Sequence, residues 1–170
     1  MPRDDRELLE ASKALQYDID MLIFTYEKIR DFPENGPSQD TRLRDLYLEC
    51  FLLHARSLIG FFHLQKGKGK RGDEEVKAED YHSYFPIELE AEHAILIIKG
   101  KIDGALSNLA FLTKNRRNWN NIIQYLTREL HASARRFLSV VERPKYTLTL
   151  EQSIIDMGKL AEESAVPFKD

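Results

Sequence analysis

Apolar residues recur at helical spacing along most of this chain, beginning near its N-terminus. Six of them share one face of a helix, four at intervals of seven residues: Leu8, Leu15, Ile19, Leu22, Tyr26 and Ile29. Asp4 and Glu7 resemble a capping box at the start of this pattern. The pattern predicts a helix from about Asp5 to Arg30, and the Pro, Asn and Gly residues at 33–37 predict the turn that ends it.

The next segment, 42–65, is apolar almost all round when it is drawn as a helix. Because each lies seven residues from the next, Glu49, Arg56 and His63 nonetheless fall within about 40° of one another on it. A helix this apolar belongs in the middle of a fold. Charged groups on such a helix must be paired, lie in a cleft or face a partner. We therefore expect a central helix that starts near 38–41 and ends about Gln65.

A third helix begins after Pro86, where apolar residues again step by three or four. These residues are Ala91, Ile95, Ile98, Ile102, Ala105, Leu109 and Leu112. Gly100 and Gly104 interrupt the pattern, and each costs about 1 kcal/mol in a helix relative to Ala. They predict either a kink or a close approach to a neighbouring helix.

Two more helices follow in the C-terminal third. The polar stretch 114–118 predicts a turn before a helix from about Trp119 to Val141, in which Trp119 belongs to the core. Thr149 with Gln152 predicts the cap of a last helix, about 150–164.

These segments predict an all-α fold, an up-down helical bundle of four long helices plus a short C-terminal helix. A length of 170 residues fits one domain, 1–170. The glycine-rich, charged stretch 66–75 predicts a flexible linker, and 76–85 a short helical or irregular piece. The tail after Pro167 is expected to fray.

Composition says more about the cellular compartment of the protein than about its function. The net charge is −3, but residues 1–50 carry 12 acidic and 7 basic side chains, whereas residues 111–147 carry 8 basic and 2 acidic ones. Such asymmetry either steers an anionic partner or pairs two faces in an oligomer, and it is also common on solvated helix faces. Cys50 is the only cysteine, which fits a reducing, cytoplasmic setting and a small buried hydrophobe. The apolar runs are too short for a membrane span, so no membrane partner is expected.

Arg56 and His63 are the candidate catalytic residues. A histidine can act as general base or acid near neutral pH, and an arginine can hold a phosphodiester. Glu49 can instead bind Arg56, so the stripe has an alternative interpretation as an internal ion-pair ladder or a polar dimer seam.

No cofactor or metal is predicted. The pairs Glu90/His93 and Glu79/His82 have the Glu-x-x-His spacing of di-metal bundles, but the first points away from the apolar face and the second lies beside the linker. Phosphate-binding glycine loops, paired-cysteine zinc spacings and a nucleophile elbow are absent from the sequence.

A basic group in the C-terminal third is the candidate binding surface. It comprises Arg116, Arg117, Arg128, Arg135 and Arg136, with further cations at Lys114, Arg143 and Lys145. Such a group would neutralise phosphates of RNA or another nucleic acid in a salt-dependent way without reading sequence.

Two stretches carry a family resemblance. LLHARSLIGFF (52–62) followed by AEDY (78–81), and KIDGALSNLAFLTKNR (101–116) followed by Trp119, resemble a group of small bacterial all-helical proteins related to the HEPN-like domains. HEPN ribonucleases are metal-independent and commonly dimeric, with an Arg followed four to six residues later by a His. The best-matching positions here are Lys101 and Asn108. Because Asn cannot act as a general base, the resemblance implies the fold and a homodimer rather than cleavage of RNA.

The resulting hypothesis is a non-enzymatic HEPN-like domain that self-associates or docks a partner through its second and third long helices. Two alternatives stay open. One is a metal-independent ribonuclease that uses Arg56 and His63, and the other is nucleic-acid binding without chemistry.

Overall fold

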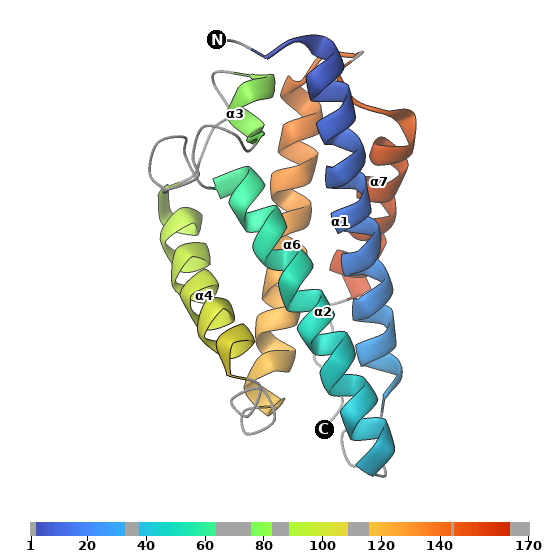
Figure 1. The fold of residues 1–170 in the computed structure, drawn as a ribbon, viewed down its shortest axis with the longest axis vertical. Coiled ribbons are helices and arrows are strands. Elements are labelled where there is room, and N and C mark those ends of the chain that lie inside the picture. Colours follow the sequence, from blue (N-terminus) through green and yellow to red (C-terminus); the bar gives the residue numbers. More distant parts are fainter. Residues whose placement is uncertain are drawn as a thin grey trace.

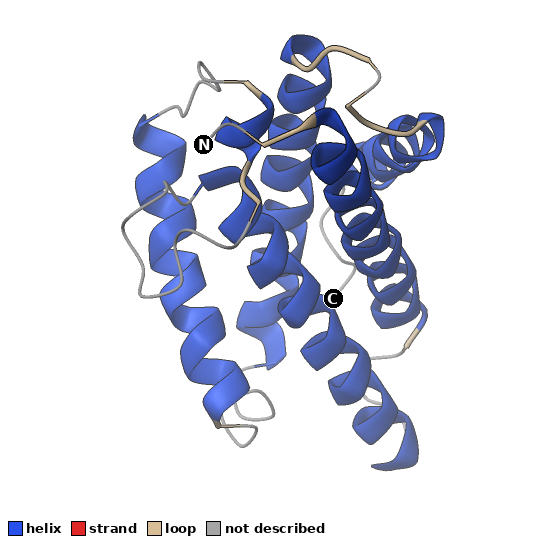
Figure 2. Ribbon diagram, turned by 45° about the horizontal axis from the view of Figure 1, so that its top comes forward, coloured by secondary structure: helices blue, strands red, loops and turns tan. Residues whose placement is uncertain are grey.

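The computed structural model describes residues 3–32, 38–63, 76–82, 89–108, 116–143 and 145–163. The described residues are mainly helical, with no strand among them (Figure 2). The helices are α1 (Asp5–Asp31), α2 (Ser38–His63), α3 (Ala78–Tyr81), α4 (Leu89–Ser107), α6 (Arg116–Val140) and α7 (Leu148–Glu163). The predicted all-α class is confirmed.

The long helices alternate in direction, as Figure 1 shows: α1, α4 and α7 run down the view, whereas α2 and α6 run up. The oblique helix α2 packs against α1, α4 and α6, while α7 closes the bundle against α1 and α6. The core is continuous across the bundle and takes residues from every one of these helices.

Helix α1 forms where the sequence predicts it. The Asp4 carboxylate accepts a hydrogen bond from the Glu7 amide at 2.8 Å and caps the helix. The six apolar residues of the predicted face are all buried, with exposed fractions of at most 3%. The heptad-like spacing therefore identified the buried face of this helix correctly.

The buried side of α2 is wide, and it confirms that this helix is central. Seven of its residues are at most 3% exposed: Leu48, Phe51, Leu52, Ala55, Leu58, Ile59 and Phe62. Burying each of the six leucine, isoleucine and phenylalanine side chains is worth about 1.5–3 kcal/mol, so α2 supplies a large share of the hydrophobic stabilisation.

Aromatic rings join α3 to the bundle. Tyr81 packs against Phe61 and Phe137 in edge-to-face contacts with ring centroids 5.9 and 4.9 Å apart. The Tyr81 hydroxyl donates to the Leu8 carbonyl at 2.5 Å. Burial raises the pKa of this hydroxyl, so it stays a donor over the whole stable range of pH. A four-residue helix is thus held by α1, α2 and α6 together.

Three sequence predictions need correction. Helix α6 begins at Arg116, so residues 116–118 of the predicted turn are its first turn. Helix α7 begins at Leu148 and its capping hydroxyl belongs to Thr147, which accepts from the Leu150 amide at 3.1 Å; Thr149 lies inside the helix. Helix α4 is unbroken from Leu89 to Ser107, and no neighbouring atom lies within 4 Å of a Cβ built at Gly100 or Gly104. The predicted linker 66–75 and the tail after Pro167 lie outside the described residues.

Gly158 is the glycine that a close contact requires. A Cβ at this position in α7 would lie 2.8 Å from Nε2 of His131 in α6. We expect Gly158→Ala to raise the free energy of unfolding by less than Gly100→Ala does, because the His131 ring must shift to make room for the methyl group. Gly100→Ala, which meets open space, should raise it by about 0.5–1 kcal/mol. Urea unfolding measures both.

The control is the same change in a His131→Ala background, where Gly158→Ala should stabilise as much as Gly100→Ala does. If Gly158→Ala stabilises the wild-type chain as much as Gly100→Ala does, α6 and α7 do not pack as described.

Candidate functional site

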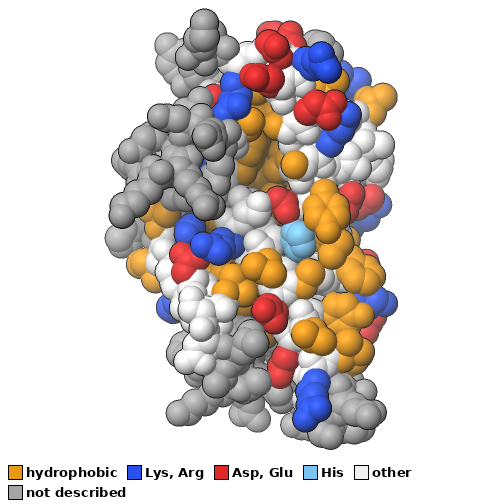
Figure 3. Space-filling model, in the orientation of Figure 1, with side chains coloured by type: hydrophobic (Ala, Val, Ile, Leu, Met, Phe, Trp, Pro, Cys, Tyr) orange, Lys and Arg blue, Asp and Glu red, His pale blue; other side chains and the backbone are white. Residues whose placement is uncertain are grey.

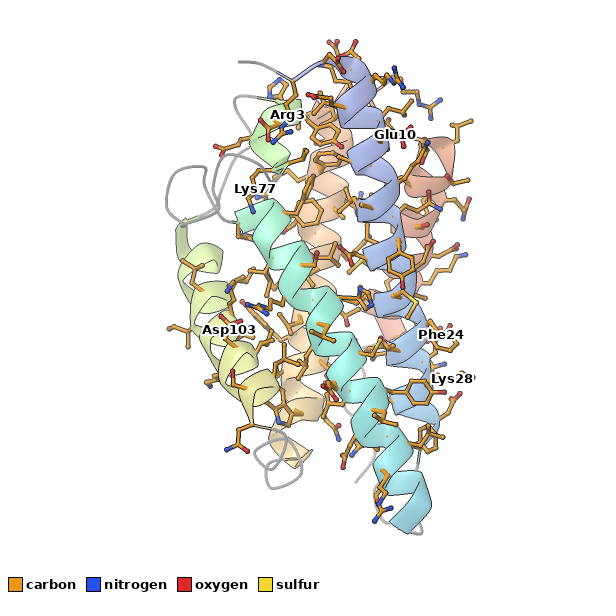
Figure 4. All side chains as sticks on the ribbon, in the orientation of Figure 1. Arg3, Glu10, Phe24, Lys28, Lys77 and Asp103 are labelled. Carbon is orange, nitrogen blue, oxygen red and sulfur yellow. The ribbon has the colours of Figure 1, made fainter. Side chains whose placement is uncertain are left out.

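Arg56 lies on the side of α2 that faces α4, and its side chain is 50% exposed. Its Nε atom is 2.7 Å from Oδ1 of Asp103, and Nζ of Lys99 is 2.8 Å from the other oxygen of the same carboxylate. Figure 4 shows Asp103 on α4, beside α2. Two cations therefore share one carboxylate at the seam between α2 and α4. The charge of Arg56, the middle residue of the predicted stripe, is thus paired within the protein.

His63 is buried one helical heptad further on. Only 7% of it is exposed, and its Nε2 atom lies 3.0 Å from the Ser133 hydroxyl on α6. The Ser133 hydroxyl donates to the Glu129 carbonyl at 2.9 Å, so it accepts from His63 Nε2–H. This assigns the neutral Nε2–H tautomer. The other ring nitrogen, Nδ1, is buried without a hydrogen-bond partner among the described residues.

Electrostatics keep His63 neutral. Burial, reinforced by the positive charge of Arg136, lowers its pKa from 6.5 to about 4. A general base needs to reach the proton that it removes, and this ring is enclosed between α2 and α6. Arg56 turns to Asp103 and His63 turns to Ser133, so the described structure does not direct the two predicted catalytic residues at one common substrate position. Glu49, the third member of the stripe, is partly exposed on the same side of α2.

The predicted basic surface is only partly assembled. Arg128 and Arg135 are exposed on α6 and lie seven residues apart, hence on one side of it. Arg136 is half-buried and close enough to His63 to lower the pKa of that ring. Arg116 and Arg117 lie in the first turn of α6, and their side chains are outside the described residues. Glu129 lies on α6 beside Arg128, and Glu142 follows the end of the helix, so these two acids offset part of the positive charge.

The two positions that best match the HEPN Arg and His, Lys101 and Asn108, lie on α4 and directly after its end. Lys101 is exposed within the helix, and Asn108, directly after its end, is exposed as well. No cluster of three or more His, Cys, Asp or Glu side chains able to hold a metal ion occurs within the described residues. Glu79 and His82 belong to α3 and its C-cap, whereas the side chains of Glu90 and His93 lie outside the described set.

Sequence reasoning missed a polar cluster between α1 and α2. The Asp18 carboxylate lies 2.7 Å from Nδ1 of His54 and accepts from the Ser57 hydroxyl at 2.5 Å. The Tyr17 ring meets the His54 ring edge to face, with centroids 5.5 Å apart. The three polar residues come from two helices that the sequence cannot align with each other. Only the spacing of His54 and Ser57, three residues apart on one helix, hints at a shared site.

A second missed feature is an exposed apolar surface. Among the described residues, nine large apolar side chains are exposed, and five of them lie on α1 and α2: Tyr17, Phe24, Leu43, Leu46 and Leu53. We call these five residues the α1–α2 face. Their exposed fractions run from 43% to 60%. Figure 3 shows hydrophobic atoms gathered over these two helices.

The α1–α2 face is braced by aromatic contacts across the seam between its two helices. Phe24 meets the Tyr47 ring with centroids 6.0 Å apart, and Phe32 meets it at 5.8 Å. Cys50 lies on α2 between Leu46 and Leu53 and is only partly buried, where the sequence predicts a buried thiol. Burial and the neighbouring Glu49 raise the pKa of this thiol, which disfavours a nucleophilic thiolate.

Comparison with known proteins returned no match to a protein-family model, a curated protein or a solved structure. The described helices also include none that combines the length and apolar character of a membrane span.

Stability should report the state of His63. In the unfolded chain its pKa is the ordinary 6.5, whereas in the folded protein it is about 4. The unfolded state therefore binds the proton first, and stability is complete above pH 6.5 and lost as the pH falls towards 4. Between about pH 7 and pH 5 this one group should cost about 2 kcal/mol. His63→Gln should remove that loss.

Urea unfolding of both proteins at several pH values measures the difference in slope, which is insensitive to any constant destabilisation by the substitution. Equal slopes for His63→Gln and wild type would mean that His63 is not held neutral.

Proposed function

We propose that this protein is a non-enzymatic, HEPN-like helical domain that self-associates through the α1–α2 face. The observation that carries the proposal is the exposure of Tyr17, Phe24, Leu43, Leu46 and Leu53 on two adjacent helices. Contiguous apolar surface of this kind is uncommon on monomers and is typical of interaction sites. The proposal moves the expected interface from α2 and α4 to α1 and α2, because the outward apolar residues of α2 adjoin α1.

The pattern along α1 favours a second copy of the same chain as the partner. Six residues at alternating spacings of four and three form one line on this helix: Glu10, Ala14, Tyr17, Met21, Phe24 and Lys28. All six are exposed or partly exposed. Figure 4 labels Glu10, Phe24 and Lys28 along the same side of α1. The line is apolar in its middle, acidic at one end and basic at the other.

Such a line is complementary to itself when two copies run antiparallel. A two-fold axis near residue 19 would bring Glu10 of one copy opposite Lys28 of the other, and Tyr17 opposite Met21. Spacings of three and four residues are those of helices that pack side by side. Leu46 and Leu53 of α2 would extend the apolar contact beside this seam. An isologous dimer therefore satisfies both the apolar surface and its charged ends.

The geometry gives less support to the two alternatives. A ribonuclease would need His63 to reach RNA, but that ring is 7% exposed and bonded to Ser133. Nucleic-acid binding would rest on Arg128 and Arg135, which share α6 with Glu129. A cytoplasmic location is part of the proposal and rests on the single cysteine.

Leu46→Glu should weaken self-association without unfolding the chain, because Leu46 is 60% exposed in the isolated protein. Placing a carboxylate in an apolar interface loses the burial of a leucine, about 1.5–3 kcal/mol, so the dissociation constant should rise at least about tenfold. Sedimentation velocity over a concentration series measures it.

The matched control is Leu148→Glu on α7, which replaces a leucine that is 67% exposed and lies outside the α1–α2 face. That variant should associate like the wild type. A wild-type chain that stays monomeric at every concentration, or equal effects of the two substitutions, would contradict the proposal.

A further inference from the structure

A groove opens between α1 and the C-terminal half of α2. It has a volume of about 670 Å³ and is bounded at one end by Val76 and Lys77, just before α3, and at the side by Lys99 of α4. In Figure 3 hydrophobic atoms are visible in the hollow of this face, between α1 and α2. A volume of roughly 300–1,000 Å³ is usual for sites that bind small molecules.

The floor of the groove is apolar and includes two residues with little or no side chain, Ala11 and Gly60. Ala11 and Leu15 of α1 face Gly60 and Phe61 of α2 across it. No neighbouring atom lies within 4 Å of a Cβ built at Gly60, so the absence of a side chain there keeps the groove open. No neighbouring atom requires a glycine here, in contrast to Gly158, where the His131 ring lies close.

The rim of the groove carries an excess of positive charge. Its charged lining residues are Arg56, Lys77 and Lys99 against a single acid, Asp18. Asp18 already accepts hydrogen bonds from His54 and Ser57. Arg56 and Lys99 share the one carboxylate of Asp103, and the contact from Arg56 uses Nε, one of its three guanidinium nitrogens. The Nη atoms of a half-exposed guanidinium suit a second carboxylate.

We propose that this groove binds a small amphiphilic carboxylate. Its apolar body lies on Ala11, Gly60 and Phe61, and its carboxylate meets Arg56 and Lys99 at the rim. Apolar burial supplies affinity and the two cations select the charged end. The groove adjoins the α1–α2 face, because Leu53 of that face and Ala14 of the α1 line also belong to its lining. Gly60, Arg56 and Lys99, which carry this proposal, lie outside that face.

Octanoate is the probe, with 1-octanol as its uncharged counterpart, and calorimetric titration of the full chain measures binding. Gly60→Leu fills the floor and should weaken octanoate binding at least tenfold. Its matched control is Gly104→Leu, a change at another helical glycine with open surroundings that does not line the groove, which should leave affinity unchanged. Arg56→Gln should weaken octanoate about tenfold and leave octanol unaffected.

Circular dichroism of each variant verifies the fold, and Arg56→Gln, a surface change, keeps the test available if Gly60→Leu fails to fold. Absence of octanoate binding by the wild type overturns the proposal. Equal octanoate affinity in Gly60→Leu and Gly104→Leu also overturns it. An equal loss of affinity for octanol and octanoate in Arg56→Gln would do the same. None of these results bears on the sedimentation of the wild-type chain.

Discussion

The burial of one side of α2 against α1, α4 and α6 is the constraint on which the rest of the structure depends. Seven apolar residues of this helix are almost wholly enclosed, and rotating the helix would expose the six larger ones at a cost of about 1.5–3 kcal/mol each. The orientation of every other side chain on α2 follows. Arg56 is directed at α4, His63 at α6, and Leu46 and Leu53 at solvent.

The same orientation links the two proposed sites. The outward side of α2 passes from Leu46 and Leu53 to Gly60, where α2 diverges from α1 (Figure 1). Its first half adjoins the exposed line of α1, and its second half forms one wall of the groove. One apolar helix therefore supplies core, interface and cavity wall, which explains why it is apolar almost all round although one side of it faces solvent.

Much of the fold could be predicted from hydrophobic spacing, because a helix of several turns repeats the same signal many times. The buried face of α1 agrees residue by residue with the sequence prediction, and Trp119 is buried as expected. Single local features fared worse. Thr147 rather than Thr149 caps α7, since both residues have suitable side chains and only the start of the helix decides between them. The sequence alone could not show that no neighbouring helix packs closely against Gly100 and Gly104.

Only the part of the candidate site that lies on a single helix could be predicted from the sequence. The spacing of Glu49, Arg56 and His63 correctly placed them on one stripe. Their partners lie on other helices: Asp103 forms the ion pair with Arg56, and Ser133 the hydrogen bond with His63. The exposed line on α1, from Glu10 to Lys28, could have been found from its spacing of three and four residues in the sequence. It was missed because the stronger buried pattern of Leu8, Leu15 and Leu22 occupies the same helix.

The central claim is that α1 meets a second α1 antiparallel across a two-fold axis, with Glu10 opposite Lys28. Charge reversal tests it most directly. Glu10→Lys alone and Lys28→Glu alone each place like charges together twice in the dimer, and each should weaken association about tenfold.

The decisive measurement is the dissociation constant of the double variant, Glu10→Lys with Lys28→Glu, by sedimentation equilibrium. Our account predicts a value restored close to that of the wild type, because the opposite charges meet again. A double variant that is weakened by the product of the two single effects would contradict it.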